Sequence, residues 1–233
     1  MSSLPAALPL WRADRLAAAA GGAPVRPTGF AALDAELPGG GWPGAGLIEL
    51  LLETPGHGEL RLLAPALAAM TAPLLWVAPP LQPYAPALAA LSLAPGRLVI
   101  VDPERAADAA WAAEQALRAG VLAAVLWWQG REPVAAPTLR RLHLAATEAR
   151  APLFALRPTS VRSQSSPALM RLALEFQAPG RLVVDVFKRR GPPLAAPLVL
   201  DLPGPVRRRR AAPVLKEEPT DAVVRVAPAS VAA

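Results

Sequence analysis

The sequence has no cysteine, and it contains only two histidines. The lack of cysteine excludes disulfides and thiolate chemistry, and it is compatible with a reducing compartment. His57 and His143 have no His-x-x-x-His spacing, so together they make a weak metal site, and we assign no metal ligand. We expect His57 to lie in a turn and His143 on the surface of a helix.

Long apolar runs are also missing. No uninterrupted apolar stretch reaches the roughly 18 residues that are needed to span a bilayer. Residues 1–15 lack a charged segment followed by a continuous apolar one, which is the pattern of a secretory signal. These absences predict a cytoplasmic protein with no membrane partner.

Charge is sparse and unevenly spread. Charged residues make up 18% of the chain and hydrophobic residues 53%, so a sizeable core is possible. The formal net charge of +6 invites a role in nucleic-acid binding. Much of the excess lies in Lys188–Arg190 and Arg207–Arg210, so the folded body is expected to be close to neutral. The length of 233 residues fits one large domain with tails, or at most two small domains.

The stretch from Gly46 to Leu62 is typical of a buried strand, a Pro/Gly turn and the start of a helix. A phosphate-binding loop with this architecture has the pattern G-x-x-x-x-G-K-[ST], in which lysine neutralises phosphate and the hydroxyl ligates Mg²⁺. Here Gly58 can serve as the last glycine, but Glu59 and Leu60 follow it. A carboxylate repels phosphate and a leucine cannot hold a metal. The degenerate loop, for which we expect no bound cofactor, consists of Glu53, Gly56, Gly58, Glu59 and Leu60.

Two further groups of a nucleotide hydrolase are missing. The acid that holds Mg²⁺ belongs at the end of an apolar strand, and by pattern Trp128 occupies that place, with a single N–H donor and no acceptor. The glutamate that activates water belongs after the second strand, where Pro79 and Pro80 stand. We therefore predict no enzymatic activity and no catalytic residue. The loop is then expected to have a structural role, in which it positions the helix that follows. On that helix, Glu59 and Arg61 are candidates for a surface role.

Strand-like and helix-like segments alternate along the chain, which predicts an α/β fold with a mostly parallel central sheet flanked by helices. A change of period near residue 170 predicts a C-terminal antiparallel hairpin. Ser166 is expected to cap a turn before Pro167. The expected strands are 47–52, 74–78, 97–101, 122–128, 153–156, 172–176, 182–187 and 198–202, and the expected helices are 59–70, 84–92, 104–119 and 137–149.

The two ends of the chain differ from the body. Residues 1–27 are expected to form a short helix, within 8–20, and a linker, and residues 28–203 the core domain. Pro, Ala, Arg and Glu without a period predict a disordered tail over 204–233. The N-terminal helix could pack on its own domain, or it could dock onto another protein. The candidates for partner contact are Trp11, Arg12 and Arg15.

Direct DNA binding is an alternative. Basic residues in or beside the hairpin could line a face that follows a phosphate backbone. Stacking aromatics are scarce there, since the alternation places Phe176 and Phe187 in the core. The possible face comprises Arg157, Arg162, Arg171, Arg181, Lys188, Arg189 and Arg190, of which Arg162, Lys188, Arg189 and Arg190 are the chosen nucleic-acid candidates.

The order of several short motifs resembles a degenerate RecA core, and the chain is similar to the ImuA family of bacterial mutagenesis cassettes. The resemblance extends from Thr28 to about Gly191. It rests on Thr28-Gly29, Leu33-Asp34, Gly39 to Pro43, Pro55 to Leu63, Leu139 to Ala146, Leu156 to Pro158, Ser166-Pro167 and Phe187 to Gly191.

The resemblance implies a noncatalytic, RecA-like adaptor or modulator in SOS-induced error-prone translesion synthesis. The implied partners are ImuB, an inactive Y-family polymerase homologue, together with RecA and an error-prone DnaE-type polymerase. DNA contact is expected to be indirect or weak, and the protein would join the nucleoid when engaged. The segments 131–137 and 159–166 are short compared with the DNA-binding loops of RecA. The alternative function is a single-stranded DNA-binding repair protein that acts directly at lesions.

Overall fold

The computed structural model describes residues 24–56, 58–130, 132–178, 180–192 and 194–202, and the two residues 225–226. The expected N-terminal helix with Trp11, Arg12 and Arg15 lies outside the described residues, as does His57. Most of the expected tail also lies outside them, apart from one short strand at its far end.

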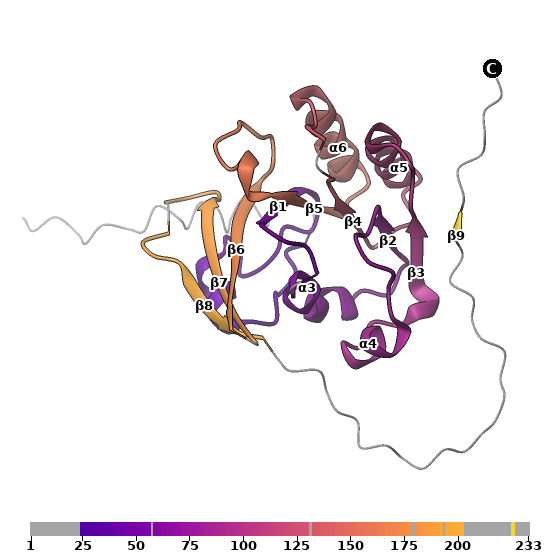
Figure 1. Cartoon of the computed structure of the whole chain (residues 1–233). Helices are drawn as coiled ribbons and strands as arrows, with labels where there is room; N and C mark the ends of the chain where they lie inside the picture. The colour runs from indigo at the N-terminus through magenta and orange to yellow at the C-terminus, as the bar shows by residue number, and fades with distance from the viewer. Residues whose placement is uncertain are drawn as a thin grey trace, which may run out of the picture.

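A single mixed sheet organises the molecule, and most of its strands are parallel (Figure 1). The first central strand, β1 (Gly46–Leu52), lies between β5 and β6, so strands far apart in sequence flank it. The strand order is β8-β7-β6-β1-β5-β4-β2-β3-β9. The other bounds are β2 (Leu74–Val77), β3 (Leu98–Val101), β4 (Ala124–Trp128), β5 (Pro152–Pro158), β6 (Met170–Ala178), β7 (Arg181–Lys188), β8 (Leu198–Asp201) and β9 (Arg225–Val226).

The parallel and antiparallel parts of the sheet are separate. Strands β1 to β6 pair in parallel, and the two-residue β9 continues this pattern beside β3. Strands β6, β7 and β8 pair in antiparallel fashion. This arrangement confirms the predicted α/β fold with a mostly parallel sheet and a C-terminal antiparallel hairpin.

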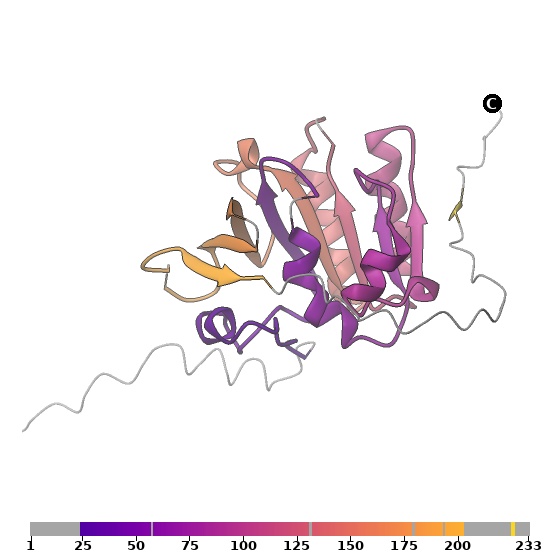
Figure 2. The same ribbon diagram turned by 60° about the horizontal axis from the view of Figure 1, so that its bottom comes forward.

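Helices cover both faces of the sheet (Figures 1 and 2). On one face lie α3 (Glu59–Ala68) and α4 (Ala85–Ala90), with α2 (Ala31–Glu36) near the antiparallel end. On the other face lie α5 (Ala106–Arg118) and α6 (Ala136–Glu148), which pack against each other. Two short 3-10 turns, η1 (Pro95–Arg97) and η2 (Thr159–Val161), join the strands. Helix α2 was not expected from the sequence.

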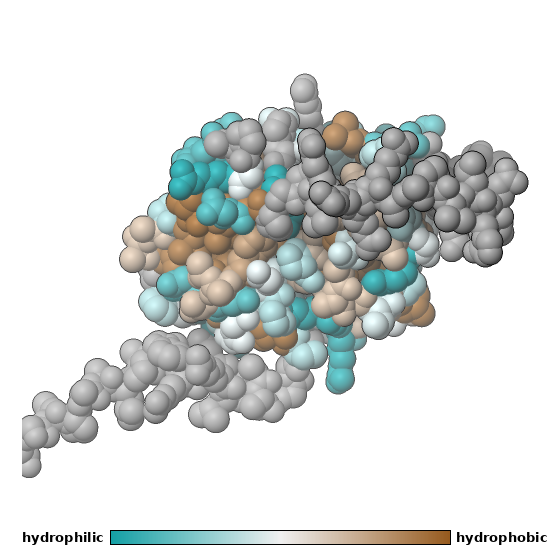
Figure 3. All heavy atoms as spheres, turned by 90° about the horizontal axis from the view of Figure 1, so that it is seen from below, coloured by the Kyte–Doolittle hydropathy of each residue, from teal (hydrophilic) through white to brown (hydrophobic). Residues whose placement is uncertain are grey.

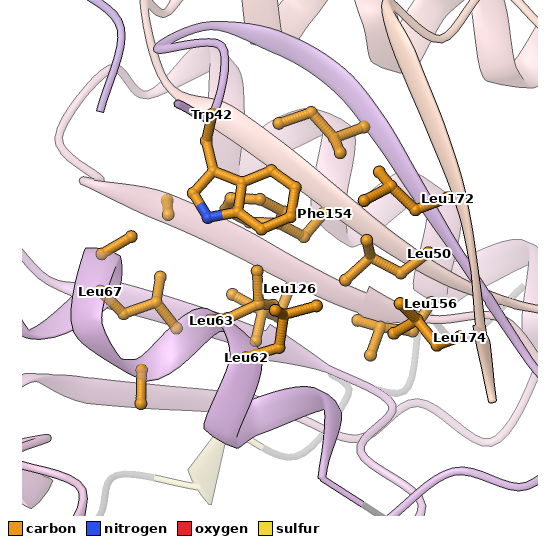
Figure 4. Packing of buried hydrophobic residues seen from close by; sticks show 14 of the residues in the cluster. Trp42, Leu50, Leu62, Leu63, Leu67, Leu126, Phe154, Leu156, Leu172 and Leu174 are labelled. Atoms are coloured by element: carbon orange, nitrogen blue, oxygen red, sulfur yellow. The ribbon is translucent and has the colours of Figure 1, made fainter. Parts of the chain in front are cut away.

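Each face of the sheet has its own hydrophobic core. Leu50, Phe154 and Leu126 point toward α3, where they meet Leu63 and the indole of Trp42 (Figure 4). The rings of Trp42 and Phe154 pack edge to face, with their centroids 5.7 Å apart. Because β1 is buried on both faces, all of its residues are buried, which is why its sequence is apolar apart from Glu49.

The side chains under α5 and α6 form the second core, which is richer in alanine. Alanine lets these helices approach the sheet closely, while larger residues fill the first core. On the side of β7 and β8, the surface seen from below carries an apolar area (Figure 3). Leu194 and Leu198 are among the partly buried residues that pack on the first core.

The Thr-Gly and Leu-Asp motifs hold the segment before β1 against α3. The backbone N–H of Thr28 donates to Asp34 Oδ1 over 2.8 Å, and Leu33 is fully buried. Gly29 has a φ of +87°, and a Cβ at this position would collide with Pro65 of α3. The motif therefore has a structural role here, because the close contact between loop and helix requires glycine.

The residues before Thr28 also belong to the folded body. Arg26 and Trp42 exchange two backbone hydrogen bonds, of 2.9 and 2.7 Å. A Cβ at Gly41 would collide with the carbonyl oxygen of Arg26, so the triple-glycine loop needs glycine there. In the described part of the chain, no helix is long and apolar enough to cross a membrane.

Candidate functional site

The loop between β1 and α3 is the candidate site, because the carboxyl ends of parallel strands are the usual ligand-binding edge of an α/β sheet. Gly56 and Gly58 have φ values of +89° and +130°, a conformation that favours glycine, and their backbone N–H groups precede the first turn of α3. Such a group of backbone donors before a helix is suited to bind an anion.

The loop's own glutamate supplies that anion. The N–H of Gly56 donates to Glu59 Oε1 over 2.6 Å, and the N–H of Gly58 donates to Oε2 over 3.1 Å. Glu59 is the first residue of α3, where the helix dipole favours negative charge, and only 1% of it is exposed. The predicted surface role for Glu59 is therefore wrong, because its side chain folds back into the loop. Its neighbour Arg61 donates through Nη2 to the carbonyl of Leu202 over 2.8 Å.

Trp128 completes the surroundings of this carboxylate. Its indole Nε1 donates to Glu59 Oε1 over 3.5 Å, and its ring packs edge to face on Trp76 at a centroid distance of 5.4 Å. Both residues end or nearly end neighbouring parallel strands. The sequence therefore placed Trp128 correctly at the end of its strand, but it did not predict that the indole would face Glu59.

The segment that contains Pro79 and Pro80 covers the loop from the other side. A Cβ at Gly56 would lie 2.9 Å from Leu81 Cδ1, so Leu81 lies directly against the glycine. The outer side of this cover is open to solvent, since Leu81 and Tyr84 are 66% and 69% exposed. The apolar side chain of Leu81 thus flanks the loop on this side. Within the described ranges, no three His, Asp or Glu side chains gather into a group that could hold a metal ion.

A buried ion network lies beside the loop, on the face covered by α6. Glu49, in the middle of β1, is fully buried. Its Oε1 accepts from Arg157 Nη1 at 2.7 Å and from Ser166 Oγ at 2.5 Å, and its Oε2 accepts from Arg171 Nε at 2.6 Å. Burial lowers the pKa of Arg157, an effect that the adjacent Glu49 carboxylate opposes. Two guanidinium groups thus share one carboxylate in the centre of the sheet.

The same network holds the loops that follow β4 and β5. Arg171 donates to the carbonyls of Val161, Arg162 and Gln164, and it thereby fixes the turn after β5. Arg157 Nε donates to Gln129 Oε1 over 2.6 Å, and the amide of Gln129 donates to the carbonyl of Glu132. Both loops are therefore tied to the sheet by side chains of the protein alone.

Sequence reasoning missed this network, although a signal was present. Glu49 is the only charged residue in β1, and a lone carboxylate in a buried strand requires a partner. Arg157 and Arg171 lie on the two strands that flank β1. The predicted cap at Ser166 is confirmed, because its Oγ accepts from the N–H of Ala168 over 3.1 Å, but its contact with Glu49 was not foreseen.

The expected nucleic-acid face is mostly engaged within the protein. The side chains of Arg157 and Arg171 are 0% and 6% exposed, so their placement on a DNA-binding face is wrong. Arg162 forms an ion pair with Asp185 at 2.5 Å, and its guanidinium lies 4.3 Å from the ring centroid of Phe187. Phe187 thus packs against arginine on the outer face, contrary to the prediction of a core residue.

The three basic residues Lys188, Arg189 and Arg190, at the end of β7, also lie in different surroundings. Lys188 Nζ donates to the carbonyl of Ser166 over 2.7 Å. Arg189 Nη1 donates to the carbonyl of Glu36 and also lies 3.4 Å from its carboxylate, which ties β7 to α2. Arg190 and Arg181 are exposed. The structure therefore does not gather these cations into one open surface.

His143 has a structural contact. Its Nδ1 accepts from the backbone N–H of Leu47 over 3.2 Å, so α6 is joined to the start of β1. Burial and the nearby Lys188 lower the pKa of His143. The neutral ring that this contact requires is thereby favoured. His143 lies on a helix, as predicted, but its side chain is half-buried by the contact with β1.

The fold and site define a class: an α/β protein whose strand–loop–helix anion site is filled by its own carboxylate. Comparison with models of known protein families gives no match, and comparison with curated proteins gives none either.

Proposed function

We propose that the chain is a noncatalytic, RecA-like adaptor or modulator in SOS-induced error-prone translesion DNA synthesis, acting through protein partners. The observation that carries the proposal is the position of the Glu59 carboxylate, which takes up the N–H groups of Gly56 and Gly58. A nucleotide phosphate would have to displace this buried carboxylate, and it would meet no lysine in its place.

The surroundings of the loop support the same conclusion. Trp128 donates to the carboxylate where a hydrolase has a metal-binding acid, and Leu81 lies against the loop from the segment where a hydrolase has its water-activating glutamate. The buried network around Glu49 holds two neighbouring loops through Arg157 and Arg171. The folded body thus offers a fixed surface, which suits an adaptor.

The assignment to translesion synthesis comes from the resemblance to the ImuA family. The proposed partners are an ImuB-type inactive polymerase homologue, RecA and an error-prone DnaE-type polymerase. The test is capture of purified ImuB and of purified RecA by the immobilised chain, with and without residues 1–20 and 204–233. Saturable binding of either partner is expected, and binding to neither in any form would refute the proposal.

The proposed inability to bind nucleotide has a separate test. Any ligand that binds only the native state raises the melting temperature. We expect millimolar ATP with Mg²⁺ to leave the melting temperature unchanged. A rise of several degrees would show that the loop opens to nucleotide and would contradict the noncatalytic assignment.

The alternative function, direct binding of single-stranded DNA, is less well supported. Arg162, Lys188 and Arg189 all contact groups of the protein itself, and Arg157 and Arg171 are buried. If DNA binding were the function, neutralising Lys188, Arg189 and Arg190 would weaken salt-sensitive binding to oligothymidylate. We expect this triple variant to retain partner capture.

A further inference from the structure

One face of the antiparallel part of the sheet lies beyond the helices. Helices α5 and α6 pack against β1, β2, β4 and β5, while β6, β7 and β8 continue past them. Side chains alternate along β6 and β7, so Leu172 and Leu174 enter the first core while Ala173 and Glu175 point to the opposite face. In Figure 1 these strands extend to the left of α6.

A groove with a volume of about 560 Å³ runs along this face and reaches the end of β1. Ala173 and Val183 contribute an apolar floor, and Glu53 is at the end next to the degenerate loop. Val199 pairs directly with Val183 on the neighbouring strand and is 54% exposed. The volume falls in the range that binds small ligands or a few residues of a peptide.

The charge of the groove is opposite to that of the whole chain. Glu53, Glu175 and Asp185 line it, together with one cation, Arg162, which already forms an ion pair with Asp185. Glu53 and Glu175 are exposed. Carboxylates around an apolar floor favour a cationic ligand and repel phosphate.

We propose that this groove binds a basic, extended segment of a protein partner, in which arginine or lysine alternates with β-branched apolar residues. The inference rests on the proposed function, because it names the chemistry of a partner for the adaptor. Apolar side chains of the segment pack on Ala173 and Val183, and its cations meet Glu53 and Glu175 at the rim. An extended segment fits because its side chains alternate in direction, so that one set faces the apolar floor while the long side chains of the other set reach the carboxylates at the rim.

The test uses a fluorescein-labelled hexapeptide of alternating arginine and valine, titrated with the full chain and followed by anisotropy. The expected results are saturable binding to the wild type and at least a tenfold weaker affinity for the charge-reversal variant Glu175→Lys. Glu53→Lys/Glu175→Lys should weaken it further. Glu148→Lys is the matched control, because Glu148 is exposed at the far end of α6 and carries the same change of charge. Its affinity should stay within about twofold of the wild type, as expected for a distant charge that is screened by salt.

Equal affinity of the wild type, Glu175→Lys and Glu148→Lys for the peptide would overturn the groove proposal. An equal loss in Glu175→Lys and Glu148→Lys would also overturn it, since binding would then follow net charge alone. Glu175→Gln, which removes charge without reversing it, gives a second variant if the lysine variant does not fold. Capture of ImuB and RecA is scored separately: its failure with intact peptide binding rejects the proposed function and leaves the groove supported.

Discussion

The indole of Trp128, at the end of β4, donates to the carboxylate of Glu59, at the start of α3, over 3.5 Å. The strand supplies the N–H donor and the first residue of the helix supplies the negative charge. In the proposed comparison with a phosphate-binding ATPase, these two places would hold a metal-binding acid and a phosphate-binding lysine. The two residues form one unit that closes the site from inside.

Replacing Glu59 by alanine should destabilise the chain. The N–H groups of Gly56 and Gly58 would lose their acceptor; because both hydrogen bonds are only part-buried, the expected cost is about 1 kcal/mol of unfolding free energy. Urea denaturation measures the change. Glu53→Ala is the control, because Glu53 is exposed, and it should change stability by less than about 0.5 kcal/mol. Equal stability of the wild type and the Glu59 variant would contradict the assigned contacts.

Replacing Trp128 by phenylalanine should also destabilise the chain. The variant loses the long indole hydrogen bond, worth about 0.5–1.5 kcal/mol at most, and it leaves a cavity in the core, where Trp128 is 4% exposed, so the total cost is expected to be about 1–3 kcal/mol. The double variant Trp128→Phe/Glu59→Ala, measured against the two single ones, gives the coupling between the two side chains. Strict additivity of the two changes in unfolding free energy would show that the indole and the carboxylate do not interact.

Restoring the lysine and hydroxyl of a phosphate-binding loop should not restore ATP hydrolysis. The double change Glu59→Lys/Leu60→Thr follows Gly58 with the missing pair, but Trp128 still supplies no metal ligand and Pro79-Pro80 supplies no base. Release of inorganic phosphate from ATP with Mg²⁺ is the measurement. Hydrolysis by this variant above that of the wild type would mean that the fold has been misinterpreted.

Glu49→Gln should be among the most damaging single changes. Arg157 and Arg171 would be left without a buried counter-charge, and breaking a buried ion pair costs about 3–5 kcal/mol of unfolding free energy. Asp185→Asn removes one partner of the exposed pair with Arg162 and should cost about 0–1 kcal/mol. Both values come from chemical denaturation, and similar losses in the two variants would rule out a special role for the buried network.

Stability should decrease below about pH 6.5 because of His143. Its pKa is lowered in the folded state, so the unfolded chain binds more protons as the pH falls through the usual histidine range. The contribution is complete above pH 6.5, and it is lost as the pH falls toward the folded-state value. Unfolding free energies from about pH 8 to about pH 5.5 measure the slope. His143→Gln should flatten it, and a slope that persists in His143→Gln would assign it to other groups.

The sequence was a good guide to the layers of the fold because hydrophobic period reflects burial directly. β1, β4 and β5 are mostly apolar and buried on both sides, and each was expected near its observed position. The glycines of the loop, and Glu59 and Leu60 in place of the lysine and hydroxyl residue of a phosphate-binding loop, also indicated where the site lies. What could not be predicted is the direction of individual polar side chains, since Glu59 can point to solvent or into the loop without any change in the local pattern.

The same limit explains the basic residues near the hairpin. Arg157, Arg162 and Arg171 occur close together in the sequence, but the topology places two of them beside Glu49, more than a hundred residues earlier in the chain. Arg189 contacts Glu36 over an even longer sequence separation. Period and composition describe neighbours along the chain, and they carry no information on such distant pairs.

The central position of β1 also constrains the order of folding during synthesis. Glu49 is 108 residues from Arg157 and 122 residues from Arg171, and β1 pairs with both of the strands that carry them. β1 is synthesised before the other strands, and it is paired on both edges only after β6 has been synthesised. Glu49 gains both of its arginine partners only at that stage. Such long-range pairing slows folding and leaves an unpaired apolar strand exposed for some time. A nascent chain that stops before Leu172 would accordingly need a chaperone to remain free of aggregation.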